Sequence, residues 1–386
     1  MNPIKMVDLK GQYEKIKTEI DQAIQKVLDQ TAFINGPEVH IFQENLQNYL
    51  DVPFVITCAN GTDALQIALM ALDLQPGDEV ITTPFTFIAT AEVIEILQLK
   101  PVFVDIDPIT FNIDTNLIEK AITTRTKVII PVHLFGQNCD MEPILQIAQK
   151  HHLFVIEDAC QSMGSDYFFS DGTTKKSGTI GDLGCTSFFP SKNLGCYGDG
   201  GAIFTRDSDL AAKCKMITNH GSTQKYYHER VGVNSRLDTI QAAVLDTKLP
   251  YLDQYIAERQ RVANYYTKYF QYNQHLITPT ISSFGTHSFH QYTLKTDPSK
   301  RDQMVQYLRD SGIPCMVYYP VPLHLQKAFQ QWGYQEGDFP ITENIAKSVF
   351  SLPIHTELSE EQLEFIVEKV NLFPHYRSDR IDELIQ

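Results

Sequence analysis

The stretch FVIEDACQ (154–161) is the segment on which the fold prediction depends. Residues 154–157 form a short, mainly apolar run, which is typical of a strand buried on both faces, and Asp158 comes directly after it. Because the carboxyl ends of strands in an α/β sheet face the ligand crevice, Asp158 is expected in a binding site. The alternative is that Asp158 caps a following helix, which is an ordinary role for an aspartate.

Further short apolar runs alternate with stretches of helical periodicity on both sides of this segment. They lie at 80–82, 102–105, 128–132, 186–189 and 202–205. Such alternation predicts an α/β fold in which helices cover both faces of a sheet. The segment 166–182 is polar and contains an Asp-Gly turn signal, so it is expected to be a surface excursion.

With 386 residues the chain exceeds what one core usually organises, and its character changes near residue 250. We therefore predict a large α/β domain over 1–250 and a smaller α+β domain over 251–386. The smaller domain is expected to contain strands near 289–294 and 314–319, with helices around 304–308 and 363–370.

Composition excludes several classes of function. Lys and Arg number 32 against 47 Asp and Glu, and the net charge of −15 disfavours nucleic acid and anionic membranes as partners. The seven cysteines show no Cys-x-x-Cys or Cys/His ligand spacing, so we expect no metal site and reduced thiols in the cytoplasm. No apolar run reaches the roughly 18 residues that a membrane helix needs.

A second motif carries a candidate catalytic residue. Lys192 ends SFFPSK (187–192), which follows an apolar run and precedes the glycine-rich NLGCYGDGG (193–201). Most lysines in such turns are simply exposed to solvent. The functional alternative is a lysine that forms a Schiff base. Nucleotide-binding motifs of the Gly-x-Gly-x-x-Gly and P-loop types do not occur, which disfavours hydride transfer and P-loop chemistry.

A Schiff-base lysine that works with pyridoxal phosphate (PLP) needs partners, and the sequence offers them. Asp158 could hold the pyridine nitrogen protonated, because the pyridinium form draws electrons from the reacting carbon. Gly61 and Thr62 begin a predicted helix, whose free amides favour a phosphate. Phe85 and Phe87 could stack on the ring, although core packing is the usual fate of such side chains.

Five motifs in order resemble the sugar aminotransferases of the DegT/DnrJ/EryC1/StrS family over nearly the whole chain. They are NGTDAL (60–65), TPFTFIATAE (83–92), VIEDACQS (155–162), SFFPSKNLGCYGDGG (187–201) and RVGVNSRLDTIQAA (230–243). The resemblance implies the aspartate aminotransferase fold, PLP-dependent fold type I, and PLP as cofactor. Within the family the chain looks most like the 3-aminotransferases of UDP-2-acetamido-2-deoxy-3-oxo-glucuronate.

The resemblance also assigns roles to residues of the cofactor site. Lys192 would carry the Schiff base, Asp158 would bind the pyridine nitrogen, and Gln161 would lie beside the ring. The remaining cofactor contacts would be Gly61, Thr62, Phe87, Ser187 and Asn234. Asn234 matches a position that reaches the cofactor of a neighbouring subunit, which implies a homodimer with shared active sites. Asn234 could otherwise be an ordinary turn residue.

Two residues are expected to contact the substrate, namely Arg236 and Tyr319. Arg236 could bind a carboxylate or phosphate through two parallel hydrogen bonds, or it could be a solvated residue at a helix start. The sequence departs from close relatives at Asn193, where proline is common, and at Tyr318, where histidine is frequent. The second departure concerns the sugar-facing side of the pocket.

The resemblance implies transfer of an amino group from L-glutamate to a nucleotide-linked keto sugar, for a bacterial surface polysaccharide such as lipopolysaccharide O-antigen. The main alternative is a 3- or 4-aminotransferase acting on a dTDP- or UDP-keto-6-deoxyhexose. A sugar dehydratase of the same fold would carry histidine in place of Lys192. A non-catalytic regulatory protein is the more distant alternative, since it would not need Lys192, Asp158 and Ser187 together.

Overall fold

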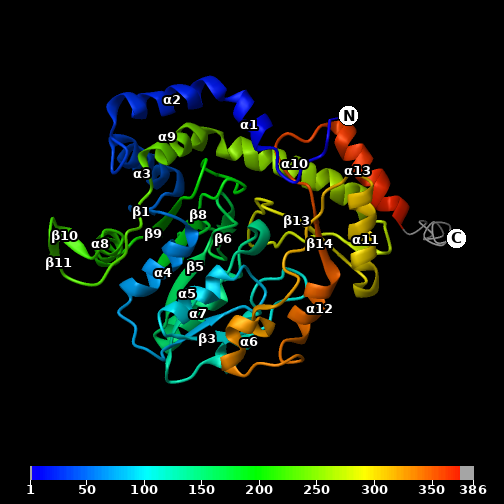
Figure 1. Ribbon diagram of the computed structural model, residues 1–386. Helices are drawn as coiled ribbons and strands as arrows, with labels where there is room; N and C mark the ends of the chain where they lie inside the picture. Colours follow the sequence, from blue (N-terminus) through cyan, green and yellow to red (C-terminus); the bar gives the residue numbers. More distant parts are fainter. Residues whose placement is uncertain (1, 374–386) are drawn as a thin grey trace.

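The computed structural model describes residues 2–373, and its centre is a seven-stranded sheet (Figure 1). The strand order is β1-β9-β8-β5-β4-β2-β3. These strands are β1 (Phe54–Cys58), β2 (Glu79–Thr82), β3 (Lys100–Phe103), β4 (Thr126–Ile129), β5 (Phe154–Asp158), β8 (Leu183–Ser187) and β9 (Gly201–Thr205).

Neighbouring strands from β3 to β8 pair in parallel, whereas β9 pairs antiparallel with both β8 and β1. All strands of the sheet except β9 therefore point the same way. Their carboxyl ends meet at one edge, which is where parallel sheets place their ligands. Asp158 and Ser187 are the last residues of the adjacent strands β5 and β8.

Helices cover both faces of the sheet, as predicted. Val80 and Val128 point to one face and pack against α4, α5 and α8, while the next residues along the strands, Ile81 and Ile129, point to the other. That second face is covered by α3, α6, α7 and α9. These helices are α3 (Pro37–Leu50), α4 (Gly61–Ala71), α5 (Ala89–Ile96), α6 (Thr115–Ala121), α7 (Met141–His151), α8 (Ser208–Ile217) and α9 (Thr239–Lys248).

A second core lies toward the C-terminal end of the chain, around a three-stranded sheet of order β12-β13-β14. It contains β12 (Leu276–Ile277), β13 (Tyr292–Thr296), β14 (Val349–Leu352), α10 (Leu252–Phe270), α11 (Pro298–Asp310) and α13 (Glu360–Leu372). The first turns of α10 pack in the core of the large sheet through Leu252 and Ile256, and its later turns pack in the second core. The domain boundary at residue 250 stays a prediction, but it falls just before a helix that belongs to both cores.

The remaining elements are short or peripheral. They are α1 (Leu9–Lys15), α2 (Lys17–Gln30), β6 (Asp166–Phe168), β7 (Thr174–Lys176), β10 (Ser222–Gln224), β11 (Tyr227–His228), α12 (Pro340–Ser348) and the 3₁₀ turns Leu134–Gly136, Leu249–Tyr251, Leu323–Leu325 and Lys327–Trp332. No helix within residues 2–373 is both long and apolar enough to cross a membrane.

Two sequence-based expectations need correction. The strand expected at 314–319 does not form, because only Met316 makes a bridge, to Ser351 of β14. The excursion at 166–182 does form a surface hairpin, β6–β7. The prediction that all of it lies at the surface is wrong for its last part, since Ser177 and Ile180 are buried. Strand β1 was not expected.

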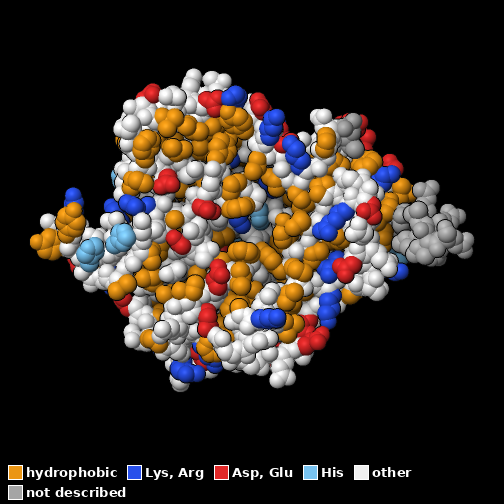
Figure 2. All heavy atoms as spheres, viewed as in Figure 1, with side chains coloured by type: hydrophobic (Ala, Val, Ile, Leu, Met, Phe, Trp, Pro, Cys, Tyr) orange, Lys and Arg blue, Asp and Glu red, His pale blue; other side chains and the backbone are white. Residues whose placement is uncertain are grey.

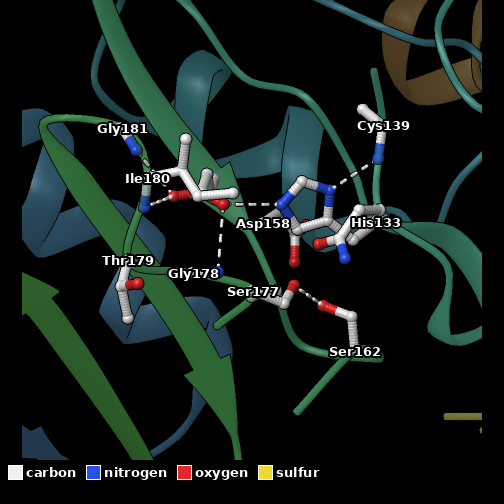
Figure 3. A network of polar contacts seen from close by, with 12 residues as sticks. His133, Cys139, Asp158, Ser162, Ser177, Gly178, Thr179, Ile180 and Gly181 are labelled. Carbon is white, nitrogen blue, oxygen red and sulfur yellow. Dashed lines mark hydrogen bonds and ion pairs between the residues drawn. The ribbon is translucent and has the colours of Figure 1, made fainter. Parts of the chain in front are cut away.

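The buried end of that excursion belongs to a network around Glu157, the residue before Asp158 (Figure 3). The Glu157 carboxylate is fully buried and accepts hydrogen bonds from the backbone amides of Gly178 (3.0 Å), Ile180 (2.6 Å) and Gly181 (2.7 Å). Its fourth partner is Nε2 of His133, at 2.8 Å. A buried carboxylate is tolerated here because donors surround it.

The tautomer of His133 follows from its other ring nitrogen. Nδ1 lies 3.0 Å from the backbone amide of Cys139 and must accept that hydrogen bond, so Nε2 carries the proton and donates it to Glu157. The backbone of His133 in turn donates to the carbonyl of Asp158 at 3.0 Å. The network thus fixes the end of β5, where Asp158 points toward the ligand edge.

We expect Glu157→Gln to lower the free energy of unfolding by about 3 kcal/mol, because the new amide group faces backbone amides that then lack an acceptor. Denaturant unfolding measures this. Glu44→Gln, at an exposed position of α3, is the matched control and should change stability by less than about 0.5 kcal/mol. Equal effects of the two variants would show that the network does not hold the end of β5.

Candidate functional site

A cavity of about 800 Å³ lies at the carboxyl ends of the parallel strands. It brings together segments that are far apart in the sequence, including all but two of the predicted site residues. The lining residues that the argument uses are Gly61, Thr62, Thr86, Phe87, Thr90, Asp158, Cys160, Gln161, Ser187, Lys192, His290, Tyr318 and Tyr319. Asn234 and Arg236 are not among the lining residues.

Lys192 lies in a tight turn after β8, where its backbone amide donates to the carbonyl of Phe189 at 2.8 Å. Burial lowers the pKa of its ammonium below the ordinary value, while the nearby Cys160 and Asp158 oppose this shift. A lowered pKa makes the free amine available closer to neutral pH. That property is required of a lysine that acts as nucleophile and base.

Asp158 is buried, with 5% of its surface exposed, and each of its carboxylate oxygens is held by one donor from the protein. Oδ2 accepts from the hydroxyl of Thr90 at 2.8 Å, and Oδ1 accepts from the backbone amide of Cys160 at 3.2 Å. A second hydroxyl, that of Thr86, lies 3.2 Å from Thr90. The remaining lone pairs of the carboxylate are free for a cationic partner. The element that follows β5 in the described part of the chain is strand β6 and not a helix, so the capping alternative fails.

The amino terminus of α4 forms an anion cradle beside Ser187. The N-cap residue Asn60 accepts from the amide of Asp63 at 2.8 Å, so this cap leaves the amides of Gly61 and Thr62 free. A side chain at position 61 would not fit, because a Cβ there would lie 2.7 Å from Cβ of Ser187 and 3.0 Å from Sγ of Cys160. Glycine thus keeps the backbone close to the cavity.

The two phenylalanines of TPFTF have different fates. Phe85 is fully buried in the core, so for this residue the core-packing alternative is correct. Phe87 is 54% exposed, lines the cavity and lies 6.3 Å from the ring of Tyr319. Gln161 uses both ends of its amide, accepting from the amide of Phe135 at 2.8 Å and donating to the hydroxyl of Tyr319 at 3.0 Å.

Asn234 and Arg236 lie on the segment between the β10–β11 hairpin and α9, outside the cavity of their own chain. Asn234 is exposed and bridges Asn219, and Arg236 is half-buried. Residue Ser235 between them accepts a hydrogen bond from the amide of Ala59 at 3.0 Å. Their predicted roles therefore require a second chain.

Sequence reasoning missed Thr90 and His290. Thr90 lies within one of the motifs, but only the fold shows that its hydroxyl meets Asp158. His290 lines the cavity from the second core; burial, together with Lys192 and Arg259, holds its pKa well below the usual range, so the ring is neutral. No sequence signal marks His290. Tyr318, singled out as a departure from relatives, also lines the cavity.

The profile of the DegT/DnrJ/EryC1/StrS aminotransferase family matches residues 14–371. The chain belongs to this family. It is 48% identical to a "Pleiotropic regulatory protein" of Geobacillus stearothermophilus, over 96% of this chain and 98% of that one. It is also 46% identical to the UDP-2-acetamido-2-deoxy-3-oxo-D-glucuronate aminotransferase of Pseudomonas aeruginosa, over 94% of this chain and 98% of that one.

Among solved structures, DesV of S. venezuelae in complex with a ketimine intermediate superposes with a TM-score of 0.93 at 36% identity, covering 98% of this chain and 100% of that one. The expected fold class is thereby confirmed. The DegT/DnrJ/EryC1/StrS aminotransferases depend on PLP, so the expected cofactor and enzyme class, a PLP-dependent sugar aminotransferase, are confirmed as well.

The residues of this chain fit PLP. The cofactor carries an aldehyde, a pyridine nitrogen and a phosphate, and the cavity offers a lysine amine, a buried carboxylate and a helix amino terminus without a side chain at position 61. Lys192 and Asp158 would hold the first two groups. Gly61, Thr62 and Ser187 would hold the phosphate.

We expect Thr90→Val, which keeps the side-chain shape, to weaken PLP binding about tenfold, because Asp158 loses a donor that orients its carboxylate. Absorbance titration of the apoprotein with PLP measures the dissociation constant. Thr90→Ser retains the hydroxyl and should bind PLP nearly as well as the native protein. An unchanged constant for Thr90→Val would remove this hydroxyl from the cofactor site.

Proposed function

We propose that this protein transfers the amino group of L-glutamate to C3 of UDP-2-acetamido-2-deoxy-3-oxo-glucuronate. The observation that carries the proposal is the meeting of Lys192, Asp158 and the α4 amino terminus in one cavity large enough for a sugar beside the cofactor. Support for the substrate comes from the Pseudomonas aeruginosa relative, which is named for this reaction.

Each residue has a distinct task in this reaction. PLP, when bound, supplies an electron sink for the carbon that loses its proton. Lys192 Nζ, freed as an amine, takes the proton from Cα of glutamate and returns one to the sugar carbon in the second half-reaction. Asp158 stabilises the positive charge on the pyridine nitrogen, and Thr90 fixes the orientation of Asp158. Ser187 and the amides of Gly61 and Thr62 bind the phosphate.

Two alternatives are separated by experiment. A dTDP- or UDP-keto-6-deoxyhexose differs from the proposed substrate in having no carboxylate at C6, so a panel of keto sugars added to the pyridoxamine phosphate form distinguishes them. A regulatory role is suggested by the name of the Geobacillus stearothermophilus relative. A purely regulatory role is disfavoured because Lys192 has a lowered pKa and shares a cavity with Asp158. A protein that only binds the cofactor does not need a lysine with a lowered pKa.

We expect L-glutamate to bleach the visible absorbance of the purified protein and the keto sugar to restore it. Lys192→Ala should lower turnover to less than about a hundredth of the native rate without changing the fold, because the amine that moves the proton is lost. Rapid-mixing absorbance measures both half-reactions. A yellow protein that glutamate does not bleach would support the regulatory alternative.

We also propose a homodimer in which each chain completes the cavity of the other. Among the described residues that line the cavity, Lys192 is the only lysine or arginine, against Asp63, Asp158 and Asp199. A nucleotide sugar brings at least two negative charges to this site. Cations from a second chain would offset these negative charges. Arg236 is a candidate, because it lies beside Asn234 on the segment between the β10–β11 hairpin and α9, outside the cavity of its own chain.

The surface supports such an assembly. Figure 1 shows the β10–β11 hairpin standing off from the body of the protein next to α8, and Figure 2 shows hydrophobic side chains at the hairpin and over the region of α2 and α3. Exposed hydrophobic residues on these segments are Leu28, Phe33, Ile34, Ile41, Tyr226, Tyr227 and Val231. Apolar area of this kind is typical of a surface that another chain covers.

We propose further that the enzyme works in the cytoplasm, on a route to a bacterial surface polysaccharide. All seven cysteines are unpaired, and six of them are buried, which suits a reducing compartment.

A mixing experiment tests the shared site. Inactive Lys192→Ala is combined with an Asn234→Ala Arg236→Ala double variant, which we expect to be inactive as well. After subunit exchange, each heterodimer should have up to about half of the activity of a native dimer, because one of its two sites then contains only native residues. Activity assays and a tag on one variant to prove exchange are the measurements. No recovery despite exchange would mean that each site is built within one chain.

A further inference from the structure

Lys248, the last residue of α9, is a buried cation without a carboxylate partner. It is 1% exposed, and none of the ion pairs among residues 2–373 includes it. Its Nζ donates to the backbone carbonyl of Gly195 at 2.5 Å and lies 5.5 Å from the centre of the Tyr197 ring. A carbonyl and the face of an aromatic ring are thus the groups that stabilise this charge.

Burying an ammonium group is costly, and the protein reflects that cost. Burial lowers the pKa of Lys248 to about 8, and Arg259 adds to this shift, while Cys196 opposes it. A position that served packing alone would be occupied at lower cost by Leu or Met. The presence of a lysine at position 248 is therefore best explained by the hydrogen bond that its ammonium donates to Gly195.

The carbonyl that it holds belongs to the turn that carries Lys192. In this turn the amide of Lys192 donates to the carbonyl of Phe189. The chain folds back so tightly at Gly195 that a Cβ there would lie 2.4 Å from the carbonyl oxygen of Pro190. Gly195 thus closes the turn three residues after Lys192, and its carbonyl is turned toward α9.

A second residue of α9 fixes the other side of the same loop. Oε1 of Gln241 accepts from the backbone amide of Tyr197 at 2.8 Å. The amide of Cys196, between these two contacts, donates to the carbonyl of Phe188 at 2.8 Å, which ties the loop back to the end of β8. The loop after Lys192 is therefore clamped between β8 and α9.

We propose that Lys248 is a positioning residue for Lys192: through Gly195 it holds the turn from which the Lys192 amine reaches the cofactor. This inference rests on the proposed function of Lys192. It gives α9 a role in catalysis although Lys248 does not line the cavity.

Reconstitution of the apoprotein with PLP tests the role without relying on turnover. Lys248→Met keeps an unbranched apolar side chain, as long as the lysine side chain up to Cε, and removes the ammonium. We expect the bond between Lys192 and PLP to form about tenfold more slowly than in the native protein, because a small displacement of the amine lowers its rate of attack. Inorganic phosphate, used as a competitor, should bind with an unchanged constant, since Gly61, Thr62 and Ser187 are untouched.

Val244→Ala is the matched control. Val244 is a fully buried residue of the same helix that packs against Ile16 and Ile20, and its side chain has no polar group that could hold the loop. It should lower the thermal midpoint while leaving the rate of bond formation unchanged. A similar slowing in Val244→Ala, or a native rate in Lys248→Met, would overturn the proposal.

A kinetic isotope effect gives an independent readout. With α-deuterated L-glutamate, Lys248→Met should show a larger primary isotope effect than the native enzyme, because proton transfer by a displaced Lys192 becomes more rate-limiting. If Lys248→Met does not fold, Gln241→Met removes the second clamp, and the same slowing is expected. A native rate in that variant would overturn the proposal, whereas absence of the bond in the native protein would instead contradict the proposed function.

Discussion

The constraint on which the site depends is the common direction of the strands around β5. Since β1, β5 and β8 all end at the same edge, Gly61, Asp158 and Ser187 meet there although long stretches of chain separate them. The backbone of Asp158 is held in turn by the buried Glu157–His133 network, which joins β5 to the loop at 178–181. A carboxylate that must keep its place opposite a cationic ring benefits from such rigid support.

Charge is distributed unevenly around this edge. Among the described residues that line the cavity, Lys192, whose pKa is lowered by burial, is the only lysine or arginine, and several aspartates line it as well. Two buried cations outside the cavity donate to backbone carbonyls: Lys248 to Gly195, and Arg259 to Phe289, His290 and Ile354. These contacts fix the two segments that carry Lys192 and His290 without placing Lys248 or Arg259 in the cavity.

Much of the site could be predicted from the sequence because its residues lie in compact motifs at strand ends. Lys192, Asp158, Gly61 and Ser187 were found in this way, and the structure places all of them in one cavity. The strand expected at 314–319 was wrong because its apolar residues pack without a ladder: Tyr318 and Tyr319 pack beside the cavity, and Met316 alone bridges β14. Burial and strand pairing both favour β-branched and aromatic residues, so local pattern does not distinguish them.

By itself, the sequence determined the α/β class, since apolar runs and turn residues are local features, and the resemblance of its five ordered motifs determined the family and the chemistry. The tertiary structure decided the contacts between residues that are far apart in the sequence. It joined the Thr90 hydroxyl to Asp158, brought His290 from the second core and placed Lys248 behind Lys192. It also showed that Asn234 and Arg236 lie outside their own cavity. Hydrogen bonds and burial arise between residues far apart in the chain, and no local pattern encodes them.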